Sequence, residues 1–225
     1  MQNKTRQSVG AIGTVPPQGT LGLGGILPKW GGNTLVFGLT GGTGAGKSHV
    51  AAVLEHLGGI ILNLDRIGHA VLAGAAYEQV VSTFGKGILA TDSTSTLDAP
   101  RPIERKKLGQ LVFNDPAALA KLNAIVHPHL TTAVYGQLAT HLRQHASTSR
   151  PLWLVLEGAL LHELKLHPVC DTVILVQASE ATRLARIMHR DGITQSQAQA
   201  RLSSQAHLAC NTPTTPVDIV IQNDE

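Results

Sequence analysis

Eight residues in the order GGTGAGKS, at positions 41 to 48, match the pattern G-x-x-x-x-G-K-[ST]. A loop that surrounds phosphate oxygens with backbone N–H groups needs conformations that are strained for residues with a Cβ atom, which explains the glycines. The helix expected to begin near Lys47 would add the positive end of its dipole. Lys47 can then contact the β- and γ-phosphates of a nucleoside triphosphate, and Ser48 can ligate Mg²⁺. The motif predicts a phosphate site at Gly41, Gly42, Thr43, Gly44, Ala45, Gly46, Lys47 and Ser48.

Asp65 is a candidate for orienting the group that accepts a phosphoryl group. It follows the apolar run GIILNL, so we expect it at the carboxyl end of a strand, close to the phosphate loop. A carboxylate there can accept a hydroxyl proton or align that hydroxyl with the γ-phosphate, as a small-molecule kinase requires. Alternatively, Asp65 is the N-cap of a helix over RIGHAVL. Residues 65–68 also match the D-x-x-G of GTPases, but the absence of an N-K-x-D motif disfavours that class.

Arg183, Arg186 and Arg190 have the spacing i, i+3, i+7 and would share one face of a helix whose other face is apolar. Such a stripe can simply be a solvated basic face. Here it leads into a polar segment, and we expect residues 189–205 to form a lid. Phosphoryl transfer needs cations around the transferring group and the exclusion of water, and a lid with arginines would provide both.

Glu157 ends the apolar run WLVLE. A carboxylate at the end of such a strand can hold a Mg²⁺-bound water, as a Walker-B residue does. The alternative is an acid at a strand end that faces solvent or pairs with a lysine. The sequence leaves both interpretations open.

Five short apolar runs rich in β-branched residues predict the strands that must position these side chains. They show no polar alternation, as is typical of parallel strands covered by helices on both faces. Helical periods separate them, so we expect an α/β fold of the P-loop NTPase class, with a five-stranded parallel sheet and flanking helices. The expected strands span residues 34–40, 59–65, 152–158, 172–178 and 218–223.

Residues 75–150 contain no convincing strand, and we expect a helical insertion there with a loop at 92–102. Asp115 as N-cap and Pro116 at the first helical position predict where one of its helices begins. An insertion beside the carboxyl edge of a parallel sheet can supply the pocket of a second substrate. The chain is thus expected to consist of a disordered, Gly- and Pro-rich leader at 1–33 and one domain at 34–225.

Composition limits the partners and the compartment. At 225 residues and 43% apolar content, the chain can bury the core of one domain. Its formal charge of +3 comes without dense basic blocks, so we expect no nucleic-acid partner. No apolar run approaches the about 18 residues of a membrane helix, and Cys170 and Cys210 lack zinc-site spacing. We expect a soluble, cytoplasmic monomer with no membrane partner and no disulfide framework.

Nine sequence blocks, taken in order, resemble those of dephospho-coenzyme A kinases over about residues 35 to 223. The ordered set is more specific than any single block, because uridine, adenylate and gluconate kinases share only the P-loop and the general layout. The resemblance implies phosphorylation of the 3′-hydroxyl of dephospho-CoA, the last step of coenzyme A synthesis, with ATP as donor and Mg²⁺ as cofactor. The blocks are LTGGTGAGKS, NLDRIGHAV, VVSTFGKGIL, IERKKLGQLVFNDP, LNAIVHPHL, ALLHE, ASEATRLARIMHRDG, ARLSSQ and VDIVIQN.

The resemblance also implies roles for individual residues. Asp65 looks like the acceptor-site carboxylate, acting as base or as hydroxyl orienter, and Asn223 resembles the residue near the adenine. Glu163, after the block ALLH, is a weaker candidate for the metal. His127 on its own would more naturally be a helix-end residue before Pro128. Lid residues near the ATP phosphates would be Arg186 and Arg190, and the acceptor region would contain His69, Arg105, Lys106 and His127.

The chain departs from this family pattern at several positions. Asn63-Leu64-Asp65 stands where the family usually has Asp-Ala-Asp, and His49 takes the place of a threonine in the ATP-binding loop. Ala159 replaces a proline, the segment 207–218 has no Lys or Arg, and the sequence ends just after the fifth expected strand. Two alternatives therefore stay open: a kinase for another acceptor, such as a nucleoside or a sugar, and a nucleotide-binding module without transfer activity.

Overall fold

The computed structural model describes residues 34–91, 101–113, 115–146, 148, 150–204 and 216–224. The expected leader at 1–33, most of the expected loop at 92–102, and residues 205–215 lie outside these ranges.

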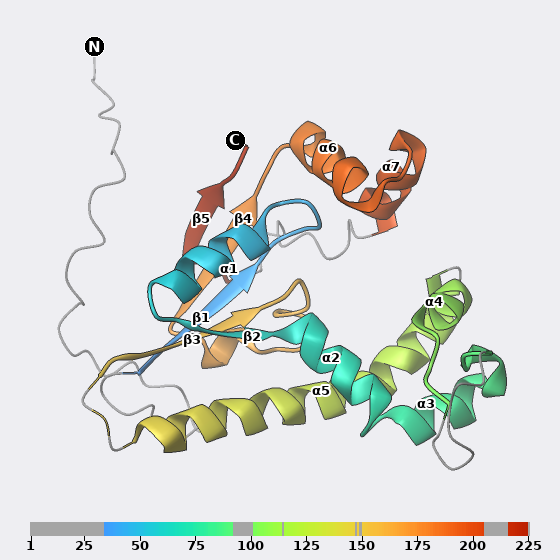
Figure 1. Ribbon diagram of the computed structural model, residues 1–225, viewed down its shortest axis with the longest axis horizontal. Helices are drawn as coiled ribbons and strands as arrows, with labels where there is room; N and C mark the ends of the chain where they lie inside the picture. The colour runs from blue at the N-terminus through green and yellow to red at the C-terminus, as the bar shows by residue number, and fades with distance from the viewer. Residues whose placement is uncertain are drawn as a thin grey trace.

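A parallel sheet of five strands forms the centre of the protein, in the order β2-β3-β1-β4-β5 (Figure 1). All five expected strands are found, with ends that differ by at most two residues. The largest difference is in β2, which ends at Asn63 because a helix begins at Leu64. The strands are β1 (Thr34–Thr40), β2 (Ile60–Asn63), β3 (Leu152–Glu157), β4 (Thr172–Gln177) and β5 (Ile219–Gln222).

The inner strands are mostly apolar because both of their faces are covered. Leu39 of β1 and Val155 of β3 belong to the smaller core cluster, which includes Ala51 of α1 (Lys47–His56). Leu154 and Leu156 of β3 belong to the larger cluster on the opposite face, with residues of the long helices that follow β2. Successive strand residues point to opposite faces, so each face needs its own apolar set. Parallel strands covered in this way show no alternation of polar residues.

The chain between β2 and β3 is helical wherever the structure describes it, apart from a single antiparallel bridge between Leu89 and Ile103. The longest helix begins as expected, because Asp115 Oδ1 accepts hydrogen bonds from Ala117 N and Ala118 N and Pro116 is the first helical residue. It continues through Pro128, so the helix end expected there is wrong. The elements are α2 (Leu64–Ala73), α3 (Tyr77–Phe84), η1 (Lys86–Ile88), α4 (Arg105–Phe113) and α5 (Pro116–His145).

Two helices after β4 form a unit with its own small core, α6 (Glu180–Asp191) and α7 (Gln195–Ser204). Ile187 of α6 and Ala198 of α7 are fully buried between them. Figure 1 shows this pair on the side of β4 and β5, away from α3 and α4. The segment at residues 41–48, called the P-loop from here on, follows β1. It therefore lies, with the carboxyl ends of the strands, between the α6–α7 pair and the helices that follow β2.

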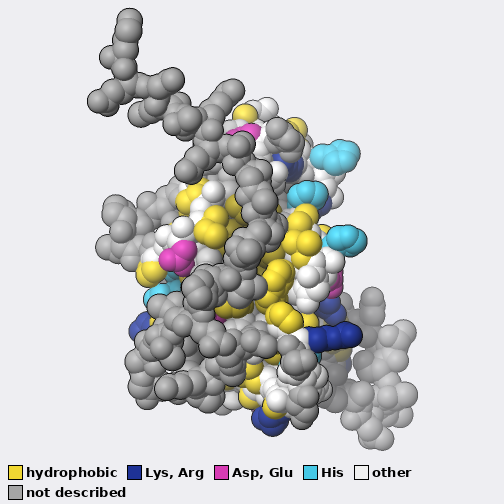
Figure 2. Space-filling model, turned by 90° about the vertical axis from the view of Figure 1, so that its left-hand side faces the viewer, with side chains coloured by type: hydrophobic (Ala, Val, Ile, Leu, Met, Phe, Trp, Pro, Cys, Tyr) yellow, Lys and Arg dark blue, Asp and Glu magenta, His cyan; other side chains and the backbone are white. Residues whose placement is uncertain are grey.

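The exposed surface of the described residues includes apolar side chains of α1 and β5, such as Val53 and Val220. On the face shown in Figure 2, hydrophobic side chains gather in the middle and the visible Lys and Arg side chains are scattered. None of the described helices is both long and apolar enough to cross a membrane.

Candidate active site

The loop between β1 and α1 has the backbone conformation that its glycines permit. Gly44 and Gly46 have φ angles of 79° and 94°, in the left-handed region that disfavours side chains. A Cβ atom on Gly46 would overlap Asn223 Nδ2, and one on Gly44 would lie 2.8 Å from Arg183 O. Gly46 is the N-cap of α1, and no side chain caps this helix end. The loop therefore carries the backbone to the start of a helix that is open to an anion.

Lys47 folds back over the same loop. Its Nζ donates hydrogen bonds to Gly41 O at 2.7 Å and to Gly42 O at 3.3 Å. The ammonium group is therefore held against the first turn of the loop, next to the backbone that is expected to bind phosphates. His49 follows on the exposed side of the first turn of α1.

The remaining loop carbonyls accept hydrogen bonds from residues of α6 and of the chain after β5. Arg183 Nε donates to Thr43 O at 2.9 Å, and Arg186 Nη1 donates to Gly44 O at 3.3 Å. Arg186 also donates to Asn223 O at 2.9 Å, while Asn223 Nδ2 donates to Ala45 O at 3.0 Å. Arg186 and Asn223 thus both lie against the loop at residues 41–48. The positions expected for them relative to ATP, beside the phosphates for Arg186 and near the adenine for Asn223, stay predictions. Sequence reasoning gave Arg183 no separate role, although the i, i+3 spacing to Arg186 was a usable signal.

Arg190 has a different position from the other two arginines. Its guanidinium donates to both carboxylate oxygens of Asp191, at 2.7 and 2.9 Å, and 62% of its side chain is exposed. Arg201 of α7 binds the same carboxylate. The hydrogen bond from Arg190 lowers the pKa of Asp191, and Arg201 lowers it further through its charge. The structure therefore does not place Arg190 against the P-loop.

Glu157 is buried at the carboxyl end of β3, with 6% of its surface exposed, so the interpretation as a solvent-facing acid is wrong. Ser48 Oγ donates to its Oε1 at 3.3 Å, and Asn63 Nδ2 donates to its Oε2 at 2.6 Å. No group of three or more His, Cys, Asp or Glu side chains suited to a metal occurs in the described part of the chain. A hydroxyl and one carboxylate nevertheless fit Mg²⁺, which binds oxygen ligands and usually combines one or two carboxylates with substrate phosphates.

Asp65 is an exposed residue in the first turn of α2 rather than the end of a strand. It is not the N-cap either, because the Oδ1 atom of Asn63 caps this helix by accepting from Arg66 N at 2.8 Å. This cap was not predicted from the sequence, although Asn is a preferred N-cap residue. Asp65 thus lies just beyond the end of β2, in the first turn of α2.

A cavity of about 200 Å³ lies between α2 and α5. It brings together three residues expected in the acceptor region, Asp65, His69 and His127, on an otherwise mostly apolar wall. Arg105 of α4 contacts the His69 ring, with Nη1 2.6 Å from Nε2. The apolar residues of the cavity are Leu64, Leu72, Leu122, Val126, Leu130 and Leu160.

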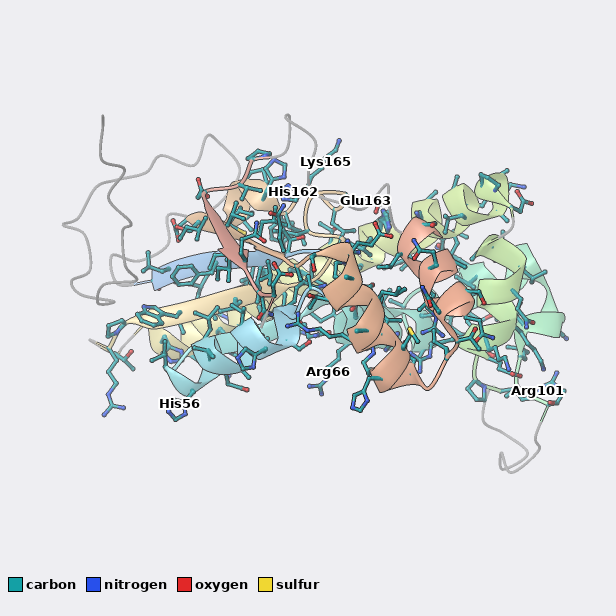
Figure 3. The ribbon with its side chains drawn as sticks, turned by 90° about the horizontal axis from the view of Figure 1, so that it is seen from above. His56, Arg66, Arg101, His162, Glu163 and Lys165 are labelled. Atoms are coloured by element: carbon teal, nitrogen blue, oxygen red, sulfur yellow. The ribbon has the colours of Figure 1, made fainter. Side chains whose placement is uncertain are left out.

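Two weaker candidates, Lys106 and Glu163, are not among the residues that line this cavity. Lys106 is exposed on α4. Glu163 accepts a hydrogen bond from Asn123, a cavity residue of α5, at 3.4 Å. Figure 3 shows Glu163 on the same side of the molecule as His162 and Lys165. Glu163 thus lies beside this cavity, and among the described residues it makes no hydrogen bond with Ser48 or Glu157.

A second cavity, of about 290 Å³, lies on the other side of the P-loop, between the ends of β4 and β5. Gly42 and Arg183 contribute to its wall, and Gln222 Nε2 donates to Gln177 Oε1 at 3.0 Å there. Asp224 Oδ1 accepts from Ser179 N at 2.5 Å, and this N–H lowers the pKa of Asp224. These polar residues were not predicted as part of a site, and their only signal was their place at or just after the ends of predicted strands.

Comparison with known proteins agrees with this geometry. The family model for dephospho-CoA kinase matches residues 35–225. The dephospho-CoA kinase of Carboxydothermus hydrogenoformans is 34% identical over 84% of this chain and 85% of its own length. That of Geobacillus kaustophilus is 37% identical over 78% of this chain and 82% of its own length.

Solved structures show the same relationship. The protein TT1252 from Thermus thermophilus is similar with a TM-score of 0.65 and 25% identity, over 86% of this chain and 90% of that one. The dephospho-CoA kinase from Campylobacter jejuni is similar with a TM-score of 0.50 and 26% identity, over 85% of this chain and 89% of that one. Because the family model spans most of the chain and curated relatives exceed 30% identity, this chain belongs to the dephospho-CoA kinase family.

Proposed function

We propose that this protein transfers the γ-phosphoryl group of ATP to the 3′-hydroxyl of dephospho-CoA, releasing ADP and coenzyme A. One observation carries the proposal beyond family membership. Ser48, in the first turn of α1, donates a hydrogen bond to Glu157, and Glu157 also accepts one from Asn63. Asp65, two residues after Asn63, lines the cavity between α2 and α5, which is proposed to bind the acceptor. A triphosphate site and a second-substrate cavity therefore meet at one edge of the sheet, as a transfer between two bound substrates requires.

The P-loop backbone and Lys47 bind the β- and γ-phosphates and stabilise the charge that develops on them during transfer. To do this, the Lys47 ammonium exchanges its hydrogen bonds with Gly41 O and Gly42 O for phosphate oxygens. Arg183 and Arg186 keep the loop in place from outside by binding its carbonyls. His49 lies beside the phosphates on the first turn of α1, and Asn223 borders the nucleoside side of the loop.

Asp65 orients the 3′-hydroxyl and accepts its proton as the oxygen attacks the γ-phosphorus. The new bond joins the 3′-oxygen to phosphorus, and the bond from phosphorus to the β,γ-bridging oxygen breaks, so the electron pair leaves with ADP. His69, Arg105 and His127 contact the acceptor in the cavity beside Asp65. Arg190 reaches the phosphates only when its ion pair with Asp191 opens, as closure of α6 and α7 would allow.

Ser48 and Glu157 would hold Mg²⁺, directly or through water. When bound, this ion neutralises negative charge on the phosphate oxygens. We further propose a cytoplasmic monomer whose substrates are ATP and dephospho-CoA, without nucleic-acid or membrane partners.

The test is ADP release from ATP by the purified chain, with and without dephospho-CoA and with a panel of nucleosides and sugars. We expect release that depends on dephospho-CoA. Equal release with another acceptor would assign a different substrate to the cavity. ATP binding without ADP release under any condition would show that the chain is a nucleotide-binding module and would overturn the proposal.

A further inference from the structure

The side chain of Asn63 links the buried carboxylate to the start of α2. Asn63 ends β2, and its Cα is paired with that of Glu157 at the end of β3. Paired residues on neighbouring strands point to the same face, so their side chains meet at the carboxyl edge of the sheet. The amide then makes two contacts: Nδ2 lies 2.6 Å from Glu157 Oε2, and Oδ1 lies 2.8 Å from Arg66 N.

These two contacts require opposite hydrogen-bonding abilities. Glu157 as a carboxylate only accepts, so its partner must donate, whereas Arg66 N–H needs an acceptor. An aspartate at position 63 could cap α2 but would place a second anionic oxygen against Glu157. A serine could also cap α2, but its hydroxyl ends closer to the backbone than the Asn63 amide nitrogen. Asn is the short side chain that carries a donor and an acceptor on one rigid planar group.

We propose that Asn63 is a positioning residue for phosphoryl transfer. Its amide nitrogen binds Oε2 of Glu157, so the other oxygen, Oε1, faces Ser48. Ser48 and Glu157 are the residues proposed to bind Mg²⁺. The Oδ1 atom of Asn63 caps α2 by accepting from Arg66 N, and this cap sets the direction in which α2 leaves the sheet. It therefore also sets the position of Asp65 in the first turn of α2. This inference rests on the proposed function.

The burial of Glu157 makes the contact with Asn63 important. With 6% of its surface exposed, the carboxylate has little access to water as a replacement donor. A hydrogen bond to a charged group contributes a free energy that changes an equilibrium constant by roughly ten- to hundredfold. The resemblance implied a missing carboxylate at position 63, whereas the structure gives the amide a contact that an ionised carboxylate could not make.

The test compares Asn63→Ser with Asp115→Ala in the full chain. Asn63→Ser keeps a capping oxygen for α2 and removes the donor to Glu157. Asp115→Ala removes the cap of α5, where Oδ1 accepts from Ala117 N and Ala118 N. ATP binding is measured by displacement of a fluorescent nucleotide, once with Mg²⁺ and once with EDTA. The melting temperature of each variant is recorded under both conditions.

We expect Asn63→Ser to weaken ATP binding in Mg²⁺ by roughly ten- to hundredfold and in EDTA by less than about twofold. Asp115→Ala should lower the melting temperature without changing either affinity. Unchanged Mg²⁺-dependent affinity in Asn63→Ser would overturn the inference, and so would an equal loss with Mg²⁺ and with EDTA. These outcomes are measured by binding, so they remain distinct from failure of the parent chain to release ADP with dephospho-CoA, which would refute the proposed function.

Discussion

Substitution of Gly46 by alanine would strain the P-loop at the residue that begins α1. Gly46 has a φ of 94°, and an alanine held there costs about 1–2 kcal/mol. The added Cβ would also overlap Asn223 Nδ2 and displace it from Ala45 O. Loss of that hydrogen bond adds about 1 kcal/mol. The combined cost of about 2–3 kcal/mol falls on the conformation that is proposed to bind phosphate.

Gly58, at the other end of α1, provides a matched control. Its φ is 97°, and no atom lies within 4 Å of the position where a Cβ would be added. Gly58→Ala should therefore lower the free energy of unfolding by about 1–2 kcal/mol and leave ATP affinity unchanged. Gly46→Ala should weaken ATP binding at least about thirtyfold, because the loop relaxes away from its phosphate-binding shape.

The assay is titration of each variant with ATP and Mg²⁺ by calorimetry, together with urea unfolding to measure stability. ATP affinity within about threefold of the parent in Gly46→Ala would show that the conformation of Gly46 does not control ATP binding. An equal loss of affinity in both variants would show the same, since it would trace the effect to the stability of α1 rather than to the loop.

Three further changes have defined outcomes. Lys47→Ala should lower turnover at least about a hundredfold through loss of charge stabilisation, with the exposed Lys86→Ala as control; near-normal turnover of Lys47→Ala would speak against the assignment. Asp65→Asn should reduce the rate of transfer measured in single turnovers more than ATP affinity, and equal losses would indicate a folding or metal defect. Burial and nearby His167 lower the pKa of His162, so the unfolded chain takes up its proton first and stability falls as pH drops below about 6.5. The drop in melting temperature should be smaller in His162→Leu, because leucine takes up no proton, and the change breaks no hydrogen bond of either ring nitrogen among the described residues; an unchanged pH profile would exclude His162 as the cause.

The fold could be predicted because its signals are local. Each strand is a continuous apolar run, and the P-loop pattern stands between a strand and a helix, where the glycines meet a specific backbone requirement. Asp115 and Pro116 marked the start of α5 for the same reason, since capping depends on neighbouring residues.

Two predicted boundaries were wrong, one because a second local signal competed with the strand pattern and one because packing against the core outweighed local propensity. The apolar run GIILNL suggested that β2 reaches Asp65, but the cap formed by Asn63 starts α2 earlier. Pro128 suggested a helix end, whereas α5 continues because its later turns bury Leu130 and Val134 against the core. Local propensity does not include this packing energy.

The arginines show the same limit. Spacing placed Arg186 and Arg190 on one helix face but could not show which partner each would meet. Arg190 binds Asp191, its direct neighbour, which also binds Arg201 of the next helix. The contact between Asn63 and Glu157 joins residues 94 positions apart, and only the register of β2 with β3 brings them together.

The P-loop and the cavity of Asp65 are proposed to bind the donor and the acceptor of one phosphoryl transfer. This is tested by ³¹P NMR of the product formed from dephospho-CoA and ATP by the purified chain. We expect a new phosphate monoester on the 3′-oxygen of the ribose, formed together with ADP and greatly reduced in Lys47→Ala. ADP formed together with inorganic phosphate and no new monoester, or a phosphate at another position, would contradict this proposal.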